Sequence, residues 1–148
     1  MSTVRRILQV KGHDAWSIAP GATVYSALKM MADRDVGSLL VMEDDRLLGT
    51  ITERDYARKV VLKGKSSKVT AVREIMTEIM YTIHPDQTIE ECMSLMTTHR
   101  TRHLPVVDHD KVYGVVSLGD VVNYKLHKQR ETIKDLEEKL SKVKAEVA

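Results

Sequence analysis

Gly49-Thr50-Ile51-Thr52-Glu53-Arg54-Asp55 is the stretch that decides the fold of this chain, because it returns 65 residues later as Gly114-Val115-Val116-Ser117-Leu118-Gly119-Asp120. The same offset pairs residues 16–60 with residues 81–125 without a gap, and most paired positions keep their apolar or polar character. Repetition at a fixed offset indicates a structural unit that is used twice. The chain is therefore a duplication, with a first repeat at residues 1–66 and a second at residues 67–125.

Each repeat carries the same series of secondary-structure signals. A short strand ends at a proline and leads to Thr23 or Thr88, each an N-cap residue before an amphipathic helix. Two apolar runs around acidic turn residues then predict a hairpin, and a second helix begins near Asp55 or Asp120. The expected strands are residues 16–18, 38–42 and 47–52 in the first repeat and 81–83, 103–107 and 112–117 in the second. The sequence thus predicts an α+β fold of two pseudo-symmetric β-α-β-β-α repeats.

A C-terminal amphipathic helix is predicted over residues 122–148. Its apolar residues follow a heptad, with Leu126, Ile133, Leu140 and Val147 at position a and Gln129, Leu136 and Val143 at position d. A parallel two-stranded coil would set Lys125 against Arg130 and Lys139 against Lys144, which repel. The pattern therefore favours an antiparallel pair or packing against a neighbouring domain.

Composition narrows the class of protein. The chain has 148 residues, and its 23 Lys and Arg nearly balance its 21 Asp and Glu, so no overall field marks it as a nucleic-acid binder. The single cysteine excludes an internal disulfide framework and fits a reducing compartment. No apolar run is long enough to cross a bilayer. We expect a cytoplasmic protein without a membrane or nucleic-acid partner.

The repeated motif places a hydroxyl and a carboxylate at the start of a helix. Free amides there and the helix dipole favour an anion, and a carboxylate suits the paired hydroxyls of a ribose. Arg54 and Arg58 stand close to Asp55 in the sequence and are suited to phosphate. The same residues equally fit an ordinary helix cap, so the motif alone leaves a structural role open.

These features together resemble a known family. Tandem Gly-x-x-(Ser/Thr)-x-x-Asp motifs, with a strand of the type Leu104-Pro105-Val106-Val107, are similar to the cystathionine-β-synthase (CBS) domain pair, or Bateman module. The resemblance covers roughly residues 4–125 and is closest to small stand-alone CBS-pair proteins. It implies a regulatory, signal-transducing sensor without a catalytic cofactor, which binds AMP, ADP, ATP, NAD(H) or another adenosyl ligand in two clefts between the halves. It also implies a homodimer in which two pairs form a disc, and an unidentified regulated protein as partner.

The resemblance also implies site residues for the two clefts. The first cleft would use Thr52, Arg54, Asp55, Arg58, Met80, Tyr81, Thr101, Arg102 and His103. The second would use Lys11, Asp14, Trp16, Val36, Gly37, Ser117, Gly119 and Asp120. Because this assignment gives the first cleft most of the basic residues, we expect it to bind phosphate more tightly. Gly119 would leave the second cleft roomier and less positive.

Two other functions remain open from the sequence. The clefts would be vestigial in an interaction adaptor, whose working surface would be the C-terminal helix. An enzyme is disfavoured because neither motif shows paired acid and base groups, a metal cluster or an activated nucleophile. Cys92 falls on an apolar helix face, and His99 and His103 lack a third metal ligand, so we expect neither a nucleophile nor a metal site.

Overall fold

The computed structural model describes residues 2–12 and 15–147, which divide into two compact units. One, here called the sheet unit, takes its residues from 13–85 and 105–115. The other, here called the helical unit, takes its residues from 1–12, 86–104 and 116–148. Neither unit equals one sequence repeat, because each also contains a segment that belongs to the other repeat.

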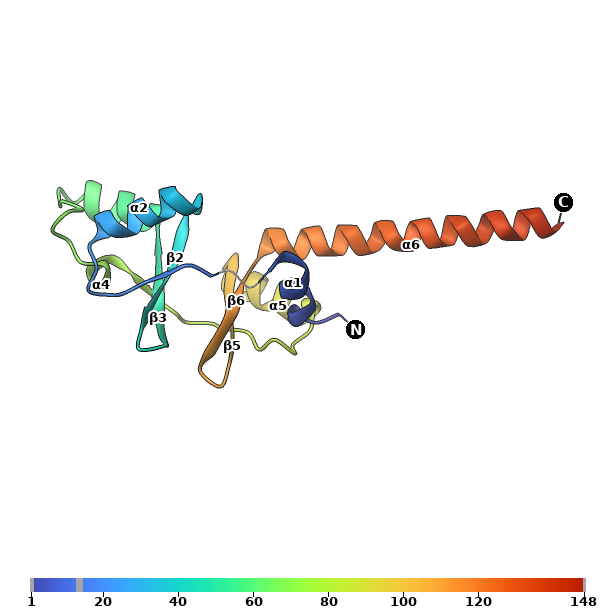
Figure 1. Ribbon diagram of the computed structural model, residues 1–148, viewed down its shortest axis with the longest axis horizontal. Coiled ribbons are helices and arrows are strands. Elements are labelled where there is room, and N and C mark those ends of the chain that lie inside the picture. The colour runs from blue at the N-terminus through green and yellow to red at the C-terminus, as the bar shows by residue number, and fades with distance from the viewer. Residues whose placement is uncertain (1, 13–14, 148) are drawn as a thin grey trace. The chain divides into compact units, whose positions relative to one another are not determined.

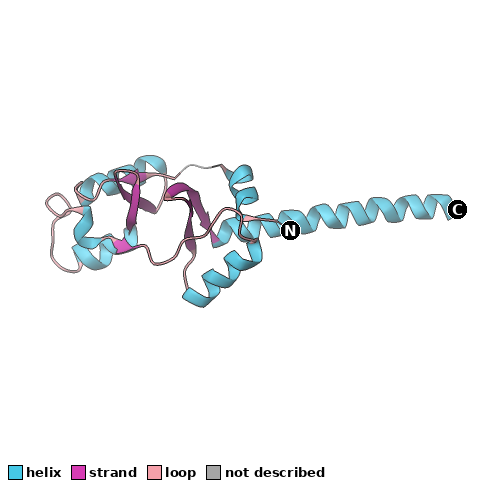
Figure 2. Ribbon diagram, turned by 90° about the horizontal axis from the view of Figure 1, so that it is seen from below, coloured by secondary structure: helices cyan, strands magenta, loops and turns pink. Residues whose placement is uncertain are grey.

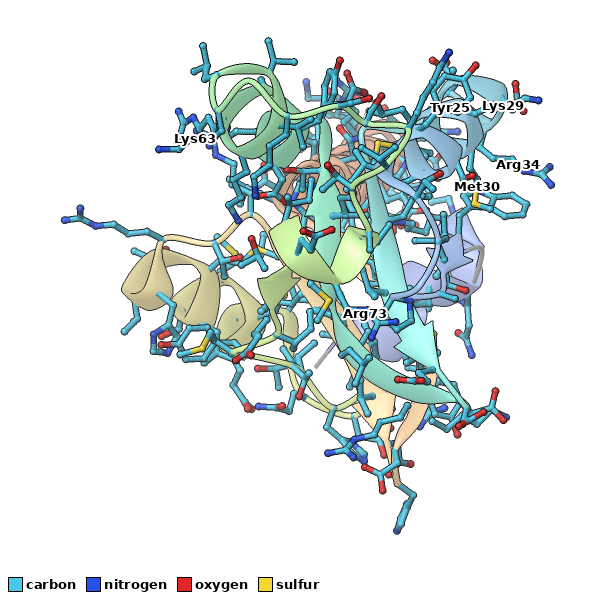
Figure 3. The ribbon with its side chains drawn as sticks, turned by 90° about the vertical axis from the view of Figure 1, so that its left-hand side faces the viewer. Tyr25, Lys29, Met30, Arg34, Lys63 and Arg73 are labelled. Carbon is cyan, nitrogen blue, oxygen red and sulfur yellow. The ribbon has the colours of Figure 1, made fainter. Side chains whose placement is uncertain are left out.

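The sheet unit is built around a four-stranded sheet with the strand order β1-β2-β3-β4. Its two long strands, β2 and β3, are labelled in Figure 1. β1 (Ser17–Ile18) runs parallel to β2 (Ser38–Glu43), and β2 forms an antiparallel hairpin with β3 (Arg46–Thr52). The helix α2 (Val24–Arg34) packs on this sheet and shares its apolar core. The opposite, exposed side of α2 carries Tyr25, Lys29 and Arg34 (Figure 3). The hairpin predicted for the first repeat is confirmed.

After β3 the chain turns into a short helical region and returns to the sheet. α3 (Glu53–Tyr56) continues directly into a π-helical turn, η1 (Ala57–Val61). α4 (Val72–Ile75) then leads into β4 (Thr77–Glu78), which pairs antiparallel with Gly49 and Thr50 of β3. Because residues 77–78 show no strand signal of their own, β4 was not predicted.

The helical unit contains α1 (Val4–Lys11), α5 (Ile89–His99) and α6 (Leu118–Val147). α1 and α5 both pack against the first turns of α6, where Val121 and Tyr124 are buried. The Tyr124 hydroxyl donates a hydrogen bond to Ser2 Oγ at 3.1 Å. α6 is one unbroken helix that begins at Leu118, so the C-terminal helix is continuous with the second helix of its repeat (Figure 2).

The segments that open the two repeats are exchanged. Thr3, just before α1, bridges to Thr88, and the Val4 amide donates to the Gln87 carbonyl at 2.9 Å. In the sheet unit, Ala71 bridges to Thr23 in the equivalent way, just before α4. The residue just before each opening helix therefore pairs with the N-cap of the helix that follows the short strand of the other repeat.

Local sequence signals explain the main helices. The side chains of Thr23 and Thr88 cap α2 and α5 by accepting hydrogen bonds from the amides of Ser26 and Glu91, both at 3.1 Å. The buried faces of these helices carry Val24, Ala27 and Met31 in α2 and Ile89, Cys92 and Met96 in α5. Both predicted caps and both predicted apolar faces are confirmed.

The second hairpin is formed by β5 (His103–Asp108) and β6 (Lys111–Ser117), as predicted. The strand expected at residues 81–83 is reduced to a single parallel bridge between Ile83 and Val106. The Ile83 amide donates to the Pro105 carbonyl at 3.0 Å, so the proline is tolerated because only its carbonyl is used. Within the described residues, no helix has the length and apolarity that a membrane span requires.

We predict that Gly49→Ala destabilises the protein by about 2 kcal/mol, because overpacking against fixed atoms costs this much. A Cβ at residue 49 would lie 2.4 Å from the Thr77 carbonyl oxygen, which is backbone and unable to move aside. Urea unfolding of the two proteins measures the change. Gly119→Ala is the control, because its Cβ would come no nearer than 3.7 Å to a neighbouring atom. Equal stability of Gly49→Ala and wild type would contradict the close approach of β4 to β3.

Candidate functional site

Both copies of the repeated motif form the same reciprocal cap at a helix start. The Asp55 amide donates to Thr52 Oγ1, and the Thr52 amide donates to Asp55 Oδ2, both at 3.0 Å. In the second copy the Asp120 amide donates to Ser117 Oγ at 3.1 Å, and the Ser117 amide donates to Asp120 Oδ2 at 2.8 Å. The structural role that the sequence left open is therefore real in both copies, and a ligand role must rest on further observations.

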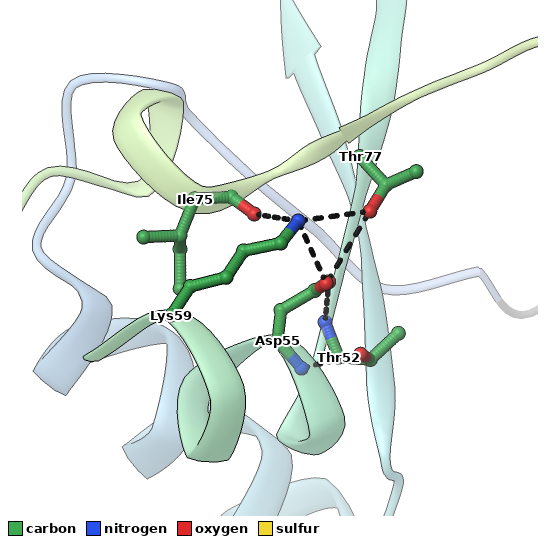
Figure 4. A network of polar contacts seen from close by, with 5 residues as sticks. All are labelled: Thr52, Asp55, Lys59, Ile75 and Thr77. Carbon is green, nitrogen blue, oxygen red and sulfur yellow. Dashed lines mark hydrogen bonds and ion pairs between the residues drawn. The ribbon is translucent and has the colours of Figure 1, made fainter. Parts of the chain in front are cut away.

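The carboxylate of Asp55 is enclosed by its own unit (Figure 4). Asp55 is only 8% exposed, and its Oδ1 lies 3.1 Å from Lys59 Nζ and 3.3 Å from Thr77 Oγ1. Lys59 Nζ also donates to the Ile75 carbonyl oxygen at 2.9 Å. Both carboxylate oxygens are thus engaged, so this network fastens α3 and η1 to the segment that leads into β4.

Sequence reasoning missed Lys59 and Thr77. The spacing of Asp55 and Lys59, four residues apart in a helical region, was a usable signal for an ion pair. Thr77 gave none, because its approach depends on β4. Arg54 and Arg58, which the sequence analysis favoured as phosphate ligands, are exposed.

The carboxylate of Asp120 stands in a more open and more basic setting. Lys11 Nζ lies 2.6 Å from Asp120 Oδ2, and the Asp120 side chain is 22% exposed. Beside it is an open depression of about 420 Å³. Its lining residues come from the start of β5 and the start of α6, and they are Arg102, His103, Ser117, Leu118, Gly119, Val122 and Asn123. This volume falls within the range of small-molecule sites.

Burial, hydrogen bonds and neighbouring charges together set the protonation states of Asp120 and His103. Burial alone would raise the pKa of Asp120, but hydrogen bonds from Lys11 and Ser117 outweigh it and hold the pKa below its usual value. Burial lowers the pKa of His103, and the positive charges of Lys11 and Arg102 lower it further against the attraction of Asp120. At neutral pH the region therefore combines an ionised carboxylate, two cations and a neutral imidazole.

We predict that His103→Gln reduces the loss of stability that mild acidification causes. Because the pKa of His103 is lowered in the folded state, the unfolded chain binds more protons below the usual histidine pKa. The stability that His103 contributes is complete above the usual histidine pKa. It is lost as the pH falls through the lowered pKa that His103 has in the folded state. Melting temperatures between about pH 7 and pH 5 should fall more steeply for wild type than for the variant. Parallel curves would contradict this assignment.

From the sequence, Val36 and Gly37 were assigned to the Asp120 cleft, and Arg102 and His103 to the Asp55 cleft. The structure shows where these two segments lie within their own units. The Glu53 amide donates to the Gly37 carbonyl at 3.1 Å, and the Leu118 amide donates to the Arg102 carbonyl at 2.8 Å. Each segment therefore lies beside the motif of its own repeat.

Hairpin register is the physical reason for this placement. Ser38 at the start of β2 pairs with Thr52 at the end of β3, so the residue before the hairpin must meet the residue after it. The basic residues Arg102 and His103 consequently belong with Ser117 and Asp120. Within the helical unit, the second motif therefore has basic neighbours of its own.

The remaining predicted residues are distributed between the units. Lys11 and Thr101 lie in the helical unit with Asp120, and the Thr101 hydroxyl donates to the His103 carbonyl at 3.0 Å. The residues in the sheet unit with Asp55 are Trp16, Val36, Gly37, Met80 and Tyr81. Trp16 is covered by the Arg34 guanidinium, 4.0 Å from the ring centroid, and Met80 is 73% exposed. Asp14 lies outside the described residues.

Cys92 should resist thiol reagents in the native state. It is fully buried on α5, and burial raises the pKa of its thiol to about 11. At pH 8 we expect reaction with a disulfide reagent to follow unfolding, so denaturant should accelerate it by orders of magnitude. Rapid labelling of the folded protein would contradict this. Within residues 2–12 and 15–147, no cluster of three metal-ligating side chains is present.

Comparison with known proteins gives a consistent result. The sequence pattern of the CBS domain matches twice, at residues 7–62 and 72–127. The mitochondrial CBS domain-containing protein CBSX3 of Arabidopsis thaliana is 40% identical, covering 91% of this chain and 70% of its own. A solved CBS-domain protein from Burkholderia ambifaria is 46% identical with a TM-score of 0.80, covering 86% of this chain and 96% of its own. The CBS-domain protein ATU1752 of Agrobacterium tumefaciens is 30% identical with a TM-score of 0.76, covering 84% and 99%.

Proposed function

This chain belongs to the CBS domain family, whose pairs are regulatory modules for adenosine ligands, and we propose that it senses an adenine nucleotide at the Ser117–Asp120 motif. AMP, ADP, ATP and NAD(H) are the candidate ligands. The observation that carries the proposal is the grouping of Lys11, Arg102 and His103 around one ionised carboxylate beside an open depression. The Asp55 motif would be the weaker site, because Lys59 and Thr77 already occupy its carboxylate.

Each group has a role that its chemistry suits. Within the described residues, the contacts to the Asp120 carboxylate all go to Oδ2, which leaves Oδ1 to accept hydrogen bonds from ribose hydroxyls. Arg102 would bind phosphate oxygens through its planar fork of donors. Lys11 lies on an exposed helix end and would move from Asp120 towards the phosphate when a nucleotide binds. The neutral His103 would add a hydrogen bond without a charge.

The proposed mode of action is a shift of population. A ligand stabilises whichever conformer binds it better, and a partner protein that prefers the same conformer is then recruited. We expect the chain to act as a homodimer of CBS pairs in the cytoplasm. We propose binding without turnover, so nucleotide recovered after incubation should be chemically unchanged by chromatography.

Thermal unfolding against a panel of ligands tests the proposal. AMP, ADP, ATP, NAD⁺, NADH and S-adenosylmethionine would be compared with GMP as a non-adenosyl control. At a hundred times its dissociation constant a ligand adds about 2.7 kcal/mol of stability, or roughly 5 to 10 °C for a chain of this size. We expect such a shift with at least one adenine nucleotide and none with GMP. No shift with any adenosyl ligand would refute the sensor function.

An adaptor function is the second candidate. It is favoured by the exposed apolar residues of α6 from Leu126 onward, which do not line the depression. Removing residues 129–148 should then abolish partner capture and leave nucleotide binding intact.

A further inference from the structure

The distal part of α6 carries an apolar stripe that its own chain leaves uncovered. From Leu126 to Val147 every helix residue is exposed. The apolar residues Leu126, Ile133, Leu136, Leu140 and Val143 are between 45% and 59% exposed. A stripe at a and d positions of a heptad is the surface by which helices pair in water. Two described ion pairs of this helix lie on the opposite side, where His127 and Lys128 both reach Glu131. At its proximal end Lys125 lies 3.2 Å from Glu90 of α5, and with its side chain 40% exposed it is also accessible to a second helix.

From this stripe and the charges beside it, we propose that α6 pairs with α6 of a second copy as an antiparallel coiled coil centred between Lys134 and Asp135. This inference is independent of the nucleotide site. In an antiparallel pair each a residue faces a d residue of the other helix. Leu126 would face the partner's Val143, Gln129 the partner's Leu140, and Ile133 the partner's Leu136.

The charges that flank the stripe select this orientation. In an antiparallel pair, residues at heptad position e lie beside the e residues of the other helix, and residues at position g lie beside its g residues. The proposed register brings Arg130 to the partner's Glu137 and Lys125 to the partner's Glu146. By symmetry each attraction occurs twice, and Thr132 facing the partner's Lys139 is neutral. No like charges meet at these flanking positions.

A parallel pair of the same two helices is disfavoured by its charges. There each g position meets an e position five residues further on, so Lys125 meets the partner's Arg130 and Lys139 meets the partner's Lys144. Each repulsion occurs twice, and no flanking attraction offsets it.

The register has a consequence at the proximal end of the helix. The next core layer of the same register would place Val122 against the partner's Val147. Val122 is 44% exposed and lines the depression beside Asp120. The paired helix would therefore end next to the candidate nucleotide site, so the second copy would contribute an apolar wall to it.

Distances between spin labels test the orientation in the full-length protein. Lys134→Cys lies next to the proposed axis, so its label should be near the same label on the second copy. Ser141→Cys lies opposite residue 128 of the other helix, so its two labels should be separated by about 20 Å along the axis. Wild type is the labelling control, because Cys92 is buried. Short distances at both positions would show a parallel pair, and no short distance at residue 134 would show no pair. Either result overturns the proposal.

A charge exchange tests the register. Glu137→Arg should remove most of the short-distance population at residue 134, because it sets one new arginine against Arg130 of each partner. The double variant Arg130→Glu with Glu137→Arg exchanges the two charges and should restore it. Glu138→Arg makes the same change of net charge on the outer side and should leave the pair intact. Failure of the exchange to rescue, or an equal loss in Glu138→Arg, would overturn the register.

Discussion

Replacing Asp55 with alanine is expected to destabilise the protein by about 3 kcal/mol, because a cap and a buried charged hydrogen-bond network are lost together. The variant removes the acceptor of the Thr52 amide, the Lys59 ammonium and the Thr77 hydroxyl at once. For a chain of this length the loss corresponds to a fall in melting temperature of roughly 6 to 12 °C.

Two variants test whether the loss of stability comes from this network or from the removal of any carboxylate. Glu53→Ala changes an exposed carboxylate in the same helical turn and should alter the melting temperature little. Lys59→Met removes one partner but keeps the cap, so its cost should be intermediate. A melting temperature of Asp55→Ala equal to that of wild type would show that the enclosed carboxylate does not hold the sheet unit together.

The second large effect is expected on ligand binding. Arg102→Gln should weaken the binding of AMP by about tenfold or more, because a charge-assisted contact to phosphate is removed. Adenosine, which has no phosphate, should bind the variant and wild type equally. The matched control is Arg58→Gln, an exposed arginine four residues from the first motif's Arg54. Isothermal titration calorimetry with both ligands measures all of these affinities.

Either of two results would contradict the assignment. Equal losses for AMP and adenosine would show that Arg102 acts on the fold of the depression and not on phosphate. A tenfold loss in Arg58→Gln with none in Arg102→Gln would instead support the phosphate site that the sequence analysis placed beside Asp55.

The sequence predicted the repeating architecture well, because that architecture is recorded in local signals. Thr23 and Thr88 cap their helices, and the apolar runs around the acidic turns form hairpins. Since these features depend on residues close together in the chain, the duplication and the resemblance to CBS domains were visible without a structure.

Contacts between distant segments were the part that the sequence could not supply. Thr77 reaches Asp55 only because residues 77–78 pair with β3, and two residues carry no strand pattern. The exchange of the opening helices is likewise invisible in the sequence. The placement of Arg102 was available from hairpin register, but the sequence analysis did not use it.

Chemical-shift mapping of ¹⁵N-labelled protein during an AMP titration tests the central claim most directly. The chain has seven glycines, and their amides report separately on the two motifs. We predict that the Gly119 amide, beside Asp120, shifts first and most, while those of Gly37 and Gly49, beside the first motif, stay in place. Shifts at Gly37 and Gly49 with a stationary Gly119 would contradict the claim that the second motif is the nucleotide site.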